Sequence, residues 1–340
     1  MKIAIFNTKY YEREYLDKYN VDGKHQLTYF EAPLNAATVA IVKDFNAVCI
    51  QLTDKLDTNV IVQLAKAGIK LIDLRSAGYD NVDLEAAANN KIKVMRVPAY
   101  SPQAIAEHAT ALILTLDRKT HKAYNRVREN NFSLQNLMGF NLFGKTVGVL
   151  GTGKIGTAFC SIMLGFGCKV IANDSLKSKT LIQKGVEYVT FEKLLALSDI
   201  ISIHCPLNPK TRHLFDSIAF SKIKKGMMLI NTSRGAIINT KDAIKALKTA
   251  QIGYLGIDVY EGEDTIFFKD LSDKVIKDDQ IERLMSFNNV LITPHQAFFT
   301  KEALDEIARI TIHNFNSFED KVMSENEVVF PVPELVTNSQ

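Results

Sequence analysis

Residues 145–174 read KTVGVLGTGKIGTAFCSIMLGFGCKVIAND, and this stretch decides the fold of the second half of the chain. A β-branched run over 146–149 ends in the glycine turn GTGKIG at 151–156, and an apolar helical pattern follows directly. A second apolar run ends at Asp174, 23 positions after Gly151. Such a turn lets the backbone and a helix N-terminus approach a pyrophosphate, while an acid about 20 residues later bonds the ribose. The spacing therefore predicts a dinucleotide site; the alternative is a tight turn without a ligand.

The composition of the chain excludes several classes of protein. Among 340 residues, 41 Lys and Arg face 38 Asp and Glu, so the net charge of +3 gives no basic excess for nucleic-acid binding. The sequence predicts neither a signal peptide nor a membrane span, because its apolar runs are too short. Its four cysteines lie in apolar runs without CxxC or metal spacing, which is typical of reduced thiols. We therefore expect a cytoplasmic protein with about two domains, no metal, and no nucleic-acid or membrane partner.

The first third of the chain predicts a small parallel α/β domain. Four short apolar runs alternate with helical segments, at residues 3–6, 47–50, 71–74 and 94–97. Pro98 and Pro102 mark a change, because Ser101 can cap a helix whose first residue is Pro102. That helix, which continues to Leu116, is apolar nearly all round, so we expect it to be buried between two units.

After the glycine turn the alternation resumes and predicts a doubly wound sheet. Further strands are expected at residues 199–204, 227–231, 253–259 and 290–293, and a helix capped by Thr240 is expected at residues 240–249. The last long helix, at about 300–318, has no strand after it and should return to the first domain. The predicted organisation is therefore a discontinuous domain of residues 1–100 and 298–340, into which a dinucleotide domain of residues 101–297 is inserted. The tail from Pro331 is expected to be disordered.

Polar residues follow three predicted strands of the dinucleotide domain, where open α/β sheets bind ligands. These are Arg234, the acids of the segment 258–263, and His295. Arginine offers a planar fork for a carboxylate, histidine titrates nearest neutrality and suits a proton transfer, and a carboxylate behind the histidine fixes its tautomer. Beside a nicotinamide these groups predict a reaction centre, although each also has a structural alternative. The loop at 75–83, at another strand end, predicts either a small-anion site or a plain turn.

Seven motifs give the chain a resemblance to the D-isomer-specific 2-hydroxyacid dehydrogenases, most of all to the NAD-dependent fermentative D-lactate dehydrogenases. They keep the family's order over nearly the whole chain: SAGYDNVD at 76–83, VPAYSPQAIAEHA at 97–109, GTGKIG at 151–156, HCPLNP at 204–209, NTSRGAIIN at 231–239, GIDVYEGE at 256–263 and TPHQAF at 293–298. The resemblance implies a flavodoxin-like substrate lobe and a Rossmann lobe that close over the substrate in a homo-oligomer. It also implies NAD as the cofactor.

Site residues follow from the resemblance motif by motif. The catalytic residues would be Arg234, Glu263 and His295; Glu261 is rejected because the family's acid lies five positions after Asp258. The cofactor would be bound by Gly151, Gly153, Lys154, Ile155, Gly156, Asp174, Cys205, Pro206, Thr232, Ser233 and Asp258. The substrate would be bound by Ala77, Gly78, Tyr79, Tyr100, Arg234 and Phe298.

The charged segment Asp264–Asp279 and the tyrosine of VPAY, Tyr100, are features of the lactate enzymes within this family. The resemblance therefore implies reversible reduction of pyruvate to D-lactate with NADH. The alternatives are another 2-oxoacid (branched 2-oxoacids, phenylpyruvate, glyoxylate or hydroxypyruvate) and, in a different class, a dinucleotide-sensing protein like the family's transcriptional corepressors. The complete set of catalytic residues argues against the second alternative.

Overall fold

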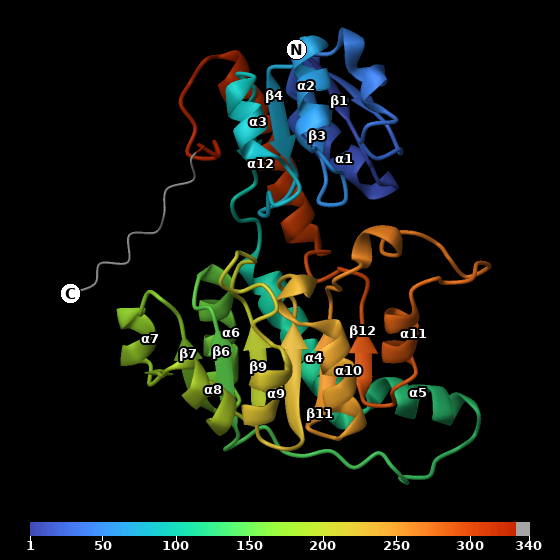
Figure 1. Cartoon of the computed structure of the whole chain (residues 1–340), viewed down its shortest axis with the longest axis vertical. Helices are drawn as coiled ribbons and strands as arrows, with labels where there is room; N and C mark the ends of the chain where they lie inside the picture. The colour runs from blue at the N-terminus through green and yellow to red at the C-terminus, as the bar shows by residue number, and fades with distance from the viewer. Residues whose placement is uncertain (331–340) are drawn as a thin grey trace. The chain divides into compact units, whose positions relative to one another are not determined.

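The computed structural model describes residues 1–330 and forms two compact units (Figure 1). The first unit comprises Met1–Ser101 and Phe299–Gln340, and the second comprises Pro102–Phe298. The chain therefore leaves its first unit, forms the second and returns to the first. The tail expected to be disordered from Pro331 lies outside the described residues.

The first unit is built on a five-stranded parallel sheet in the order β2-β1-β3-β4-β5, which is the flavodoxin-like order. Its strands are β1 (Lys2–Ile5), β2 (Gln26–Tyr29), β3 (Ala47–Ile50), β4 (Leu71–Leu74) and β5 (Lys93–Arg96). Its helices are α1 (Tyr10–Tyr19), η1 (Val21–Gly23), η2 (Val39–Asp44), α2 (Thr58–Lys66), α3 (Leu84–Asn89) and α12 (Lys301–Glu319). Asp57 and Asp83 cap α2 and α3 through their side chains. The flavodoxin-like prediction is confirmed.

Helix α12 completes the core of this unit, although it lies more than 200 residues after β5 in the sequence. Its buried residues Ala308, Ile312 and Phe315 pack with Leu16 of α1 against the strand residues Ile3, Ile5, Ala47, Cys49, Leu71 and Met95. Helices α2 and α3 pack against the strands in a separate apolar cluster. Figure 1 shows the late, red helix among the early, blue elements. Each fully buried Leu, Ile or Phe stabilises the fold by about 1.5–3 kcal/mol, so the first unit depends on the return of the chain.

The second unit contains a seven-stranded parallel sheet in the order β12-β11-β10-β9-β6-β7-β8. Its strands are β6 (Thr146–Leu150), β7 (Lys169–Asn173), β8 (Glu187–Tyr188), β9 (Ile200–Ile203), β10 (Met227–Asn231), β11 (Ile252–Ile257) and β12 (Val290–Ile292). Its helices are α4 (Pro102–Arg118), α5 (Thr120–Arg128), α6 (Lys154–Gly165), α7 (Lys179–Gln183), α8 (Phe191–Leu197), α9 (Ser217–Lys222), η3 (Gly235–Ile237), α10 (Thr240–Lys248), η4 (Glu263–Thr265) and α11 (Asp279–Met285). The strand order reverses between β6 and β9, so the doubly wound prediction is confirmed.

Helix α4 begins at Pro102 as predicted, and its buried residues Ala106, Ala109 and Leu112 belong to the core of the second unit. The helix packs closely on β11, where a Cβ at Gly256 would lie 3.0 Å from Leu116. That the helix is also buried between two units stays a prediction. The cap of α10 is Asn239, whose side chain accepts from the Asp242 amide, and not Thr240. Among the described helices, none is long and apolar enough to cross a membrane.

Candidate active site

The glycine turn between β6 and α6 has the geometry that its sequence predicts. Gly151 has φ +90°, and a Cβ there would lie 2.6 Å from the backbone nitrogen of Cys205. A Cβ at Gly156 would overlap the carbonyl oxygen of Gly151, so the helix lies directly on the turn. Gly153 caps α6 without a side-chain hydrogen bond, and a Cβ there would meet no heavy atom within 4 Å. The first amides of α6, from Lys154, therefore lie at a helix N-terminus that no side chain caps and that is open at Gly153. Such a terminus favours anions.

Asp174 follows β7 and reaches back to the glycine turn. One carboxylate oxygen accepts from the Thr152 amide at 2.5 Å and from its hydroxyl at 3.0 Å. The other accepts from the Leu176 amide at 3.0 Å and from the Ser175 hydroxyl at 3.3 Å. Burial alone would raise the pKa of this carboxyl, but these hydrogen bonds outweigh it and lower the pKa. Two of the four donors are hydroxyls that can rotate away, so the charged carboxylate retains capacity for ribose hydroxyls.

The loops after β9 and β10 are joined beside this turn. The Ser233 hydroxyl donates to the Cys205 carbonyl at 2.5 Å, and the Asn231 side chain accepts from the Ser233 amide and donates to the Arg234 carbonyl. Thr232 is buried, and its hydroxyl has no hydrogen-bond partner among the described residues. An orphaned buried hydroxyl, an uncapped helix N-terminus and an acid at the neighbouring strand end all fit a bound dinucleotide. Burial raises the pKa of the Cys205 thiol to about 12, so this cysteine is no nucleophile.

His204, which directly follows β9, is a partly buried histidine that packs on the core of the second unit. Its Nε2 lies 2.9 Å from the Ser202 hydroxyl, and its ring lies 4.9 Å from the ring of Phe159. Desolvation lowers its pKa from 6.5 to about 3, so between these pH values the histidine is neutral in the folded protein and protonated in the unfolded chain.

We expect this imidazole to make the free energy of unfolding depend on pH. Between pH 6.5 and 3 the unfolded state binds a proton that the folded state excludes, so His204 costs stability as the pH falls below about 6.5. His204→Gln keeps a hydrogen-bonding group for Ser202 but cannot titrate. The free energy of unfolding of the variant minus that of the wild type should therefore be about 2 kcal/mol larger at pH 5 than at pH 7. Urea unfolding at the two pH values measures this; an unchanged difference would contradict a neutral His204 in the folded protein.

His295 and Glu263 form the central contact of the site. His295 Nδ1 lies 2.9 Å from Glu263 Oε1, and both side chains are largely buried. The other carboxylate oxygen of Glu263 accepts from the Tyr260 amide at 2.9 Å. The competing acid, Glu261, instead contacts His213 at 2.5 Å and accepts from the Thr240 hydroxyl at 3.2 Å. A carboxylate at Nδ1 leaves Nε2 as the nitrogen available for proton transfer.

Arg234 is held beside Gly235, where two loops touch through their backbones. Its Nη1 donates to the Ser233 carbonyl at 2.9 Å, and the side chain is partly buried. A Cβ at Gly235 would overlap the backbone of Tyr260 and Glu261, so only glycine permits this approach. The arginine loop is therefore packed against the loop that carries Glu263.

The predicted insert after Glu263 contributes to the histidine's surroundings. The ring of Phe268 lies 5.9 Å from the ring of His295, and Phe267 is buried in the core. Asp278 ties the far end of the insert to the site, because both its carboxylate oxygens accept from the Tyr260 hydroxyl, at 2.9 and 2.8 Å.

Sequence reasoning missed the network that holds the His295 loop. Asp258 is fully buried, and its carboxylate accepts from the Thr293 hydroxyl and from the amides of Gln296 and Ala297. His108 of α4 lies 3.0 Å from the Thr293 hydroxyl and 3.3 Å from Asp258. Asp258 thus fixes the turn in which His295 takes its positive φ of 54°. A polar residue within the apolar helix, His108, was the available signal. That Asp258 binds the cofactor stays a prediction.

The loop after β4 in the first unit has an unusual distribution of hydrogen bonds. In the segment Ser76–Tyr79, all four backbone carbonyl groups accept a hydrogen bond. The donors are the Val97 amide to Ser76, Arg96 Nη1 to Ala77, the Ser76 hydroxyl to Gly78 and the Val82 amide to Tyr79. The amides of Ala77, Gly78 and Tyr79 donate to no acceptor within residues 1–330. Consecutive backbone donors of this kind can hold a small anion, and that they do so here stays a prediction. Tyr100 belongs to this same unit, whereas Arg234 and Phe298 belong to the second unit.

Comparison with known proteins agrees with this geometry. Residues 110–297 match the family described as D-isomer specific 2-hydroxyacid dehydrogenase, NAD binding domain. The D-lactate dehydrogenase of Escherichia coli K12 is 46% identical over 329 residues, covering 97% of this chain and 100% of that protein. The apo-structure of the Escherichia coli enzyme superposes with a TM-score of 0.87 at 45% identity, over 97% and 100% of the two chains. The Aquifex aeolicus D-lactate dehydrogenase, complexed with NAD and lactic acid, gives a TM-score of 0.85 at 30% identity, over 94% and 96%. The chain belongs to the D-isomer specific 2-hydroxyacid dehydrogenase family, and its second unit contains the family's NAD-binding domain.

Proposed function

We propose that this protein is an NAD-dependent D-lactate dehydrogenase that reversibly reduces pyruvate to D-lactate. The observation that carries the proposal is the contact between His295 and Glu263 in a member of this family. The name of the Escherichia coli relative supports the choice of pyruvate and of the D isomer.

Each group in the proposed reaction has a defined role. The Arg234 guanidinium binds the substrate carboxylate with its planar fork and polarises the ketone oxygen. Bound NADH supplies the hydride that reduces the carbonyl carbon. His295 protonates the ketone oxygen from Nε2, while Glu263 holds the other ring nitrogen and stabilises the imidazolium. In the reverse direction, neutral His295 removes the hydroxyl proton of D-lactate.

The open amides of Ala77, Gly78 and Tyr79 are proposed as further donors to the substrate carboxylate. For Tyr100 and Phe298 we propose contacts with the substrate, as the family resemblance implies. The cofactor pyrophosphate is assigned to the residues from Gly151 to Gly156 and the ribose to Asp174. Further contacts with the cofactor are proposed for Cys205, Pro206, Thr232, Ser233 and Asp258.

A panel of 2-oxoacids assayed with NADH tests the proposed reaction. Pyruvate should give the highest kcat/KM, and the product should be oxidised by an enzyme specific for D-lactate. A hydrophobic pocket separates homologues by only about 1–3 kcal/mol per methylene, so longer 2-oxoacids should be slower but active. Preference for a branched 2-oxoacid, phenylpyruvate, glyoxylate or hydroxypyruvate would reassign the substrate. Absence of turnover with every member would favour the dinucleotide-sensing alternative.

Asp174 should determine the preference for NADH over NADPH. Its carboxylate would accept ribose hydroxyls and repel a 2′-phosphate, and the next residues are Ser175, Leu176 and Lys177 rather than an arginine. Asp174→Ala should weaken NADH binding about 10- to 100-fold, the range for hydrogen bonds to a charged group. It should strengthen NADPH binding by a smaller factor, because the repulsion of the 2′-phosphate is removed, so the preference for NADH narrows mainly through the loss of NADH binding. Ser175→Ala, which removes only the 3.3 Å donor, is the control. Equal use of NADPH and NADH by the wild type would contradict this assignment.

We also propose a homo-oligomer in the cytoplasm. Helix α5 and the segment that follows it expose Tyr124, Phe132, Leu134, Met138 and Phe143, which a second copy of the chain would cover. All four cysteines are free and buried, which supports a reducing compartment. Sedimentation of the full chain measures its oligomeric state.

A further inference from the structure

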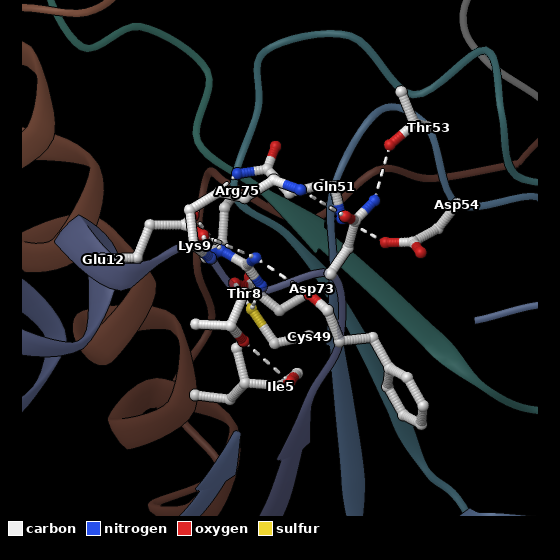
Figure 2. A network of polar contacts seen from close by, with 12 residues as sticks. Ile5, Thr8, Lys9, Glu12, Cys49, Gln51, Thr53, Asp54, Asp73 and Arg75 are labelled. Atoms are coloured by element: carbon white, nitrogen blue, oxygen red, sulfur yellow. Dashed lines mark hydrogen bonds and ion pairs between the residues drawn. The ribbon is translucent and has the colours of Figure 1, made fainter. Parts of the chain in front are cut away.

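Arg75, which directly precedes the Ser76–Tyr79 loop, is buried among the carboxyl ends of three strands (Figure 2). Its Nε donates to Glu12 Oε1 at 2.9 Å, and its Nη2 donates to the Phe6 carbonyl at 3.0 Å and to Glu12 Oε2 at 3.4 Å. Its Nη1 lies 3.4 Å from Cys49 Sγ. The side chain therefore connects the end of β4 to the loop after β1, to α1 and to β3.

Glu12 is the second centre of this network. Besides Arg75, its carboxylate accepts from the Gln51 side chain at 2.8 Å and from the Lys9 amide at 2.7 Å. Gln51 follows β3, and Lys9 caps α1. One buried carboxylate thus holds the segments that follow β1, β3 and β4, and Figure 2 shows these side chains converging.

The titratable groups around the pair either have a raised pKa or have hydrogen-bond donors of their own. Burial raises the pKa of the Cys49 thiol, and it raises the pKa of the Asp73 carboxyl well above its usual value. Burial likewise raises the pKa of Asp54 to about 6, and its carboxylate accepts from the amides of Leu34 and Gln51. The opposite charge nearest to the Arg75 guanidinium is the Glu12 carboxylate, at 2.9 Å. Such a buried pair costs desolvation energy that its attraction barely offsets, so it is weak evidence for stability.

We propose that the Arg75–Glu12 pair is a positioning device that orients the Ser76–Tyr79 loop, so that the amides of Ala77, Gly78 and Tyr79 point at a 2-oxoacid carboxylate. The inference rests on the proposed function in taking that carboxylate as the ligand. The backbone of Arg75 is held to β3, because its amide donates to the Ile50 carbonyl at 3.1 Å. Its side chain is held separately, by the Phe6 carbonyl and the Glu12 carboxylate. The chain thus enters the loop in one orientation, and the carbonyl bonds described above keep the amides facing outward.

Two single variants and their combination test the device. Arg75→Met removes the fork but fills similar volume, Glu12→Leu removes its partner, and the double variant leaves neither charge. Each single variant should lower Tm, because an unpaired buried charge remains, and the double variant should recover most of that loss. The KM for pyruvate and the inhibition constant of oxamate, which carries the same carboxylate, should rise about 10- to 100-fold in all three. NADH affinity should stay within about twofold.

The decisive readout is the double variant, since it separates orientation from stability. If KM and the oxamate constant return to wild-type values together with Tm, the pair is merely structural and the proposal is wrong. Arg75→Lys, which keeps the charge without the fork, should resemble Arg75→Met in KM. Ile61→Val, a fully buried change in α2, is the control: it should lower Tm without changing KM. Failure of the wild type to reduce any 2-oxoacid would overturn the proposed function instead, and with it the assumed ligand.

Discussion

Replacing His295 by glutamine is expected to lower kcat for pyruvate reduction by about 10²–10⁴-fold, which is the range supplied by general acid–base catalysis. Glutamine can still donate a hydrogen bond to Glu263, but it cannot release a proton to the developing alkoxide. NADH affinity should remain near the wild-type value, because the glycine turn and Asp174 lie in separate loops. Steady-state kinetics with pyruvate, together with a fluorescence titration of NADH, measures both quantities.

Backbone conformation provides the control for this variant. His295 has φ +54°, a region that asparagine tolerates better than glutamine. His295→Asn should therefore lose as much activity as His295→Gln while losing less stability. If the asparagine variant kept activity within about tenfold of wild type, strain rather than proton transfer would explain the glutamine result.

The two neighbouring acids offer a second control. Glu263→Gln removes the charge that contacts His295, so kcat should fall while a hydrogen-bonding group remains. Glu261→Gln changes an acid that contacts His213, and kcat should be little affected. Loss of kcat in the Glu261 variant alone would reverse the assignment that the spacing from Asp258 implies.

Much of the candidate site was predictable because a parallel sheet puts the carboxyl ends of its strands at one edge. Arg234, Glu263 and His295 each follow a strand whose apolar run is clear in the sequence. The turn from Gly151 to Gly156 was predictable for a different reason. Its close backbone contacts tolerate no side chain at Gly151 or Gly156, so the turn requires glycines at a fixed spacing that is visible in the sequence. These signals are local, so one sequence suffices to read them.

The elements that were missed carry weak local signals. Strand β2, at the sheet edge, has only partly buried or exposed residues, and β8 has two residues, so neither shows an apolar run. The packing of α4 in the core of the second unit was not predicted, because an apolar helix does not reveal what it packs against. The Arg75–Glu12 pair joins residues 63 positions apart, and only the fold brings them together.

Gly235→Ala should be nearly as damaging as the loss of His295, although glycine has no functional group. A Cβ at this position would overlap the backbone carbon and oxygen of Tyr260 and the nitrogen of Glu261. Backbone atoms cannot rotate away, so the two loops must separate. Overpacking of this kind destabilises by about 1–3 kcal/mol or more, and urea unfolding should show that loss.

The same separation should damage catalysis, because each loop carries part of the chemistry. Arg234 precedes Gly235, and the Tyr260 amide holds the Glu263 carboxylate that contacts His295. A displacement of about 1 Å is enough to lower kcat/KM by about a hundredfold. Gly165→Ala, near the end of α6 with no heavy atom within 4 Å of the new Cβ, should leave kcat/KM unchanged and stability equal or higher. If Gly235→Ala kept wild-type kcat/KM at a temperature where it is fully folded, the arginine loop and the glutamate loop would be able to separate without loss of function. The positions of Arg234 and Glu263 would then not depend on their close contact.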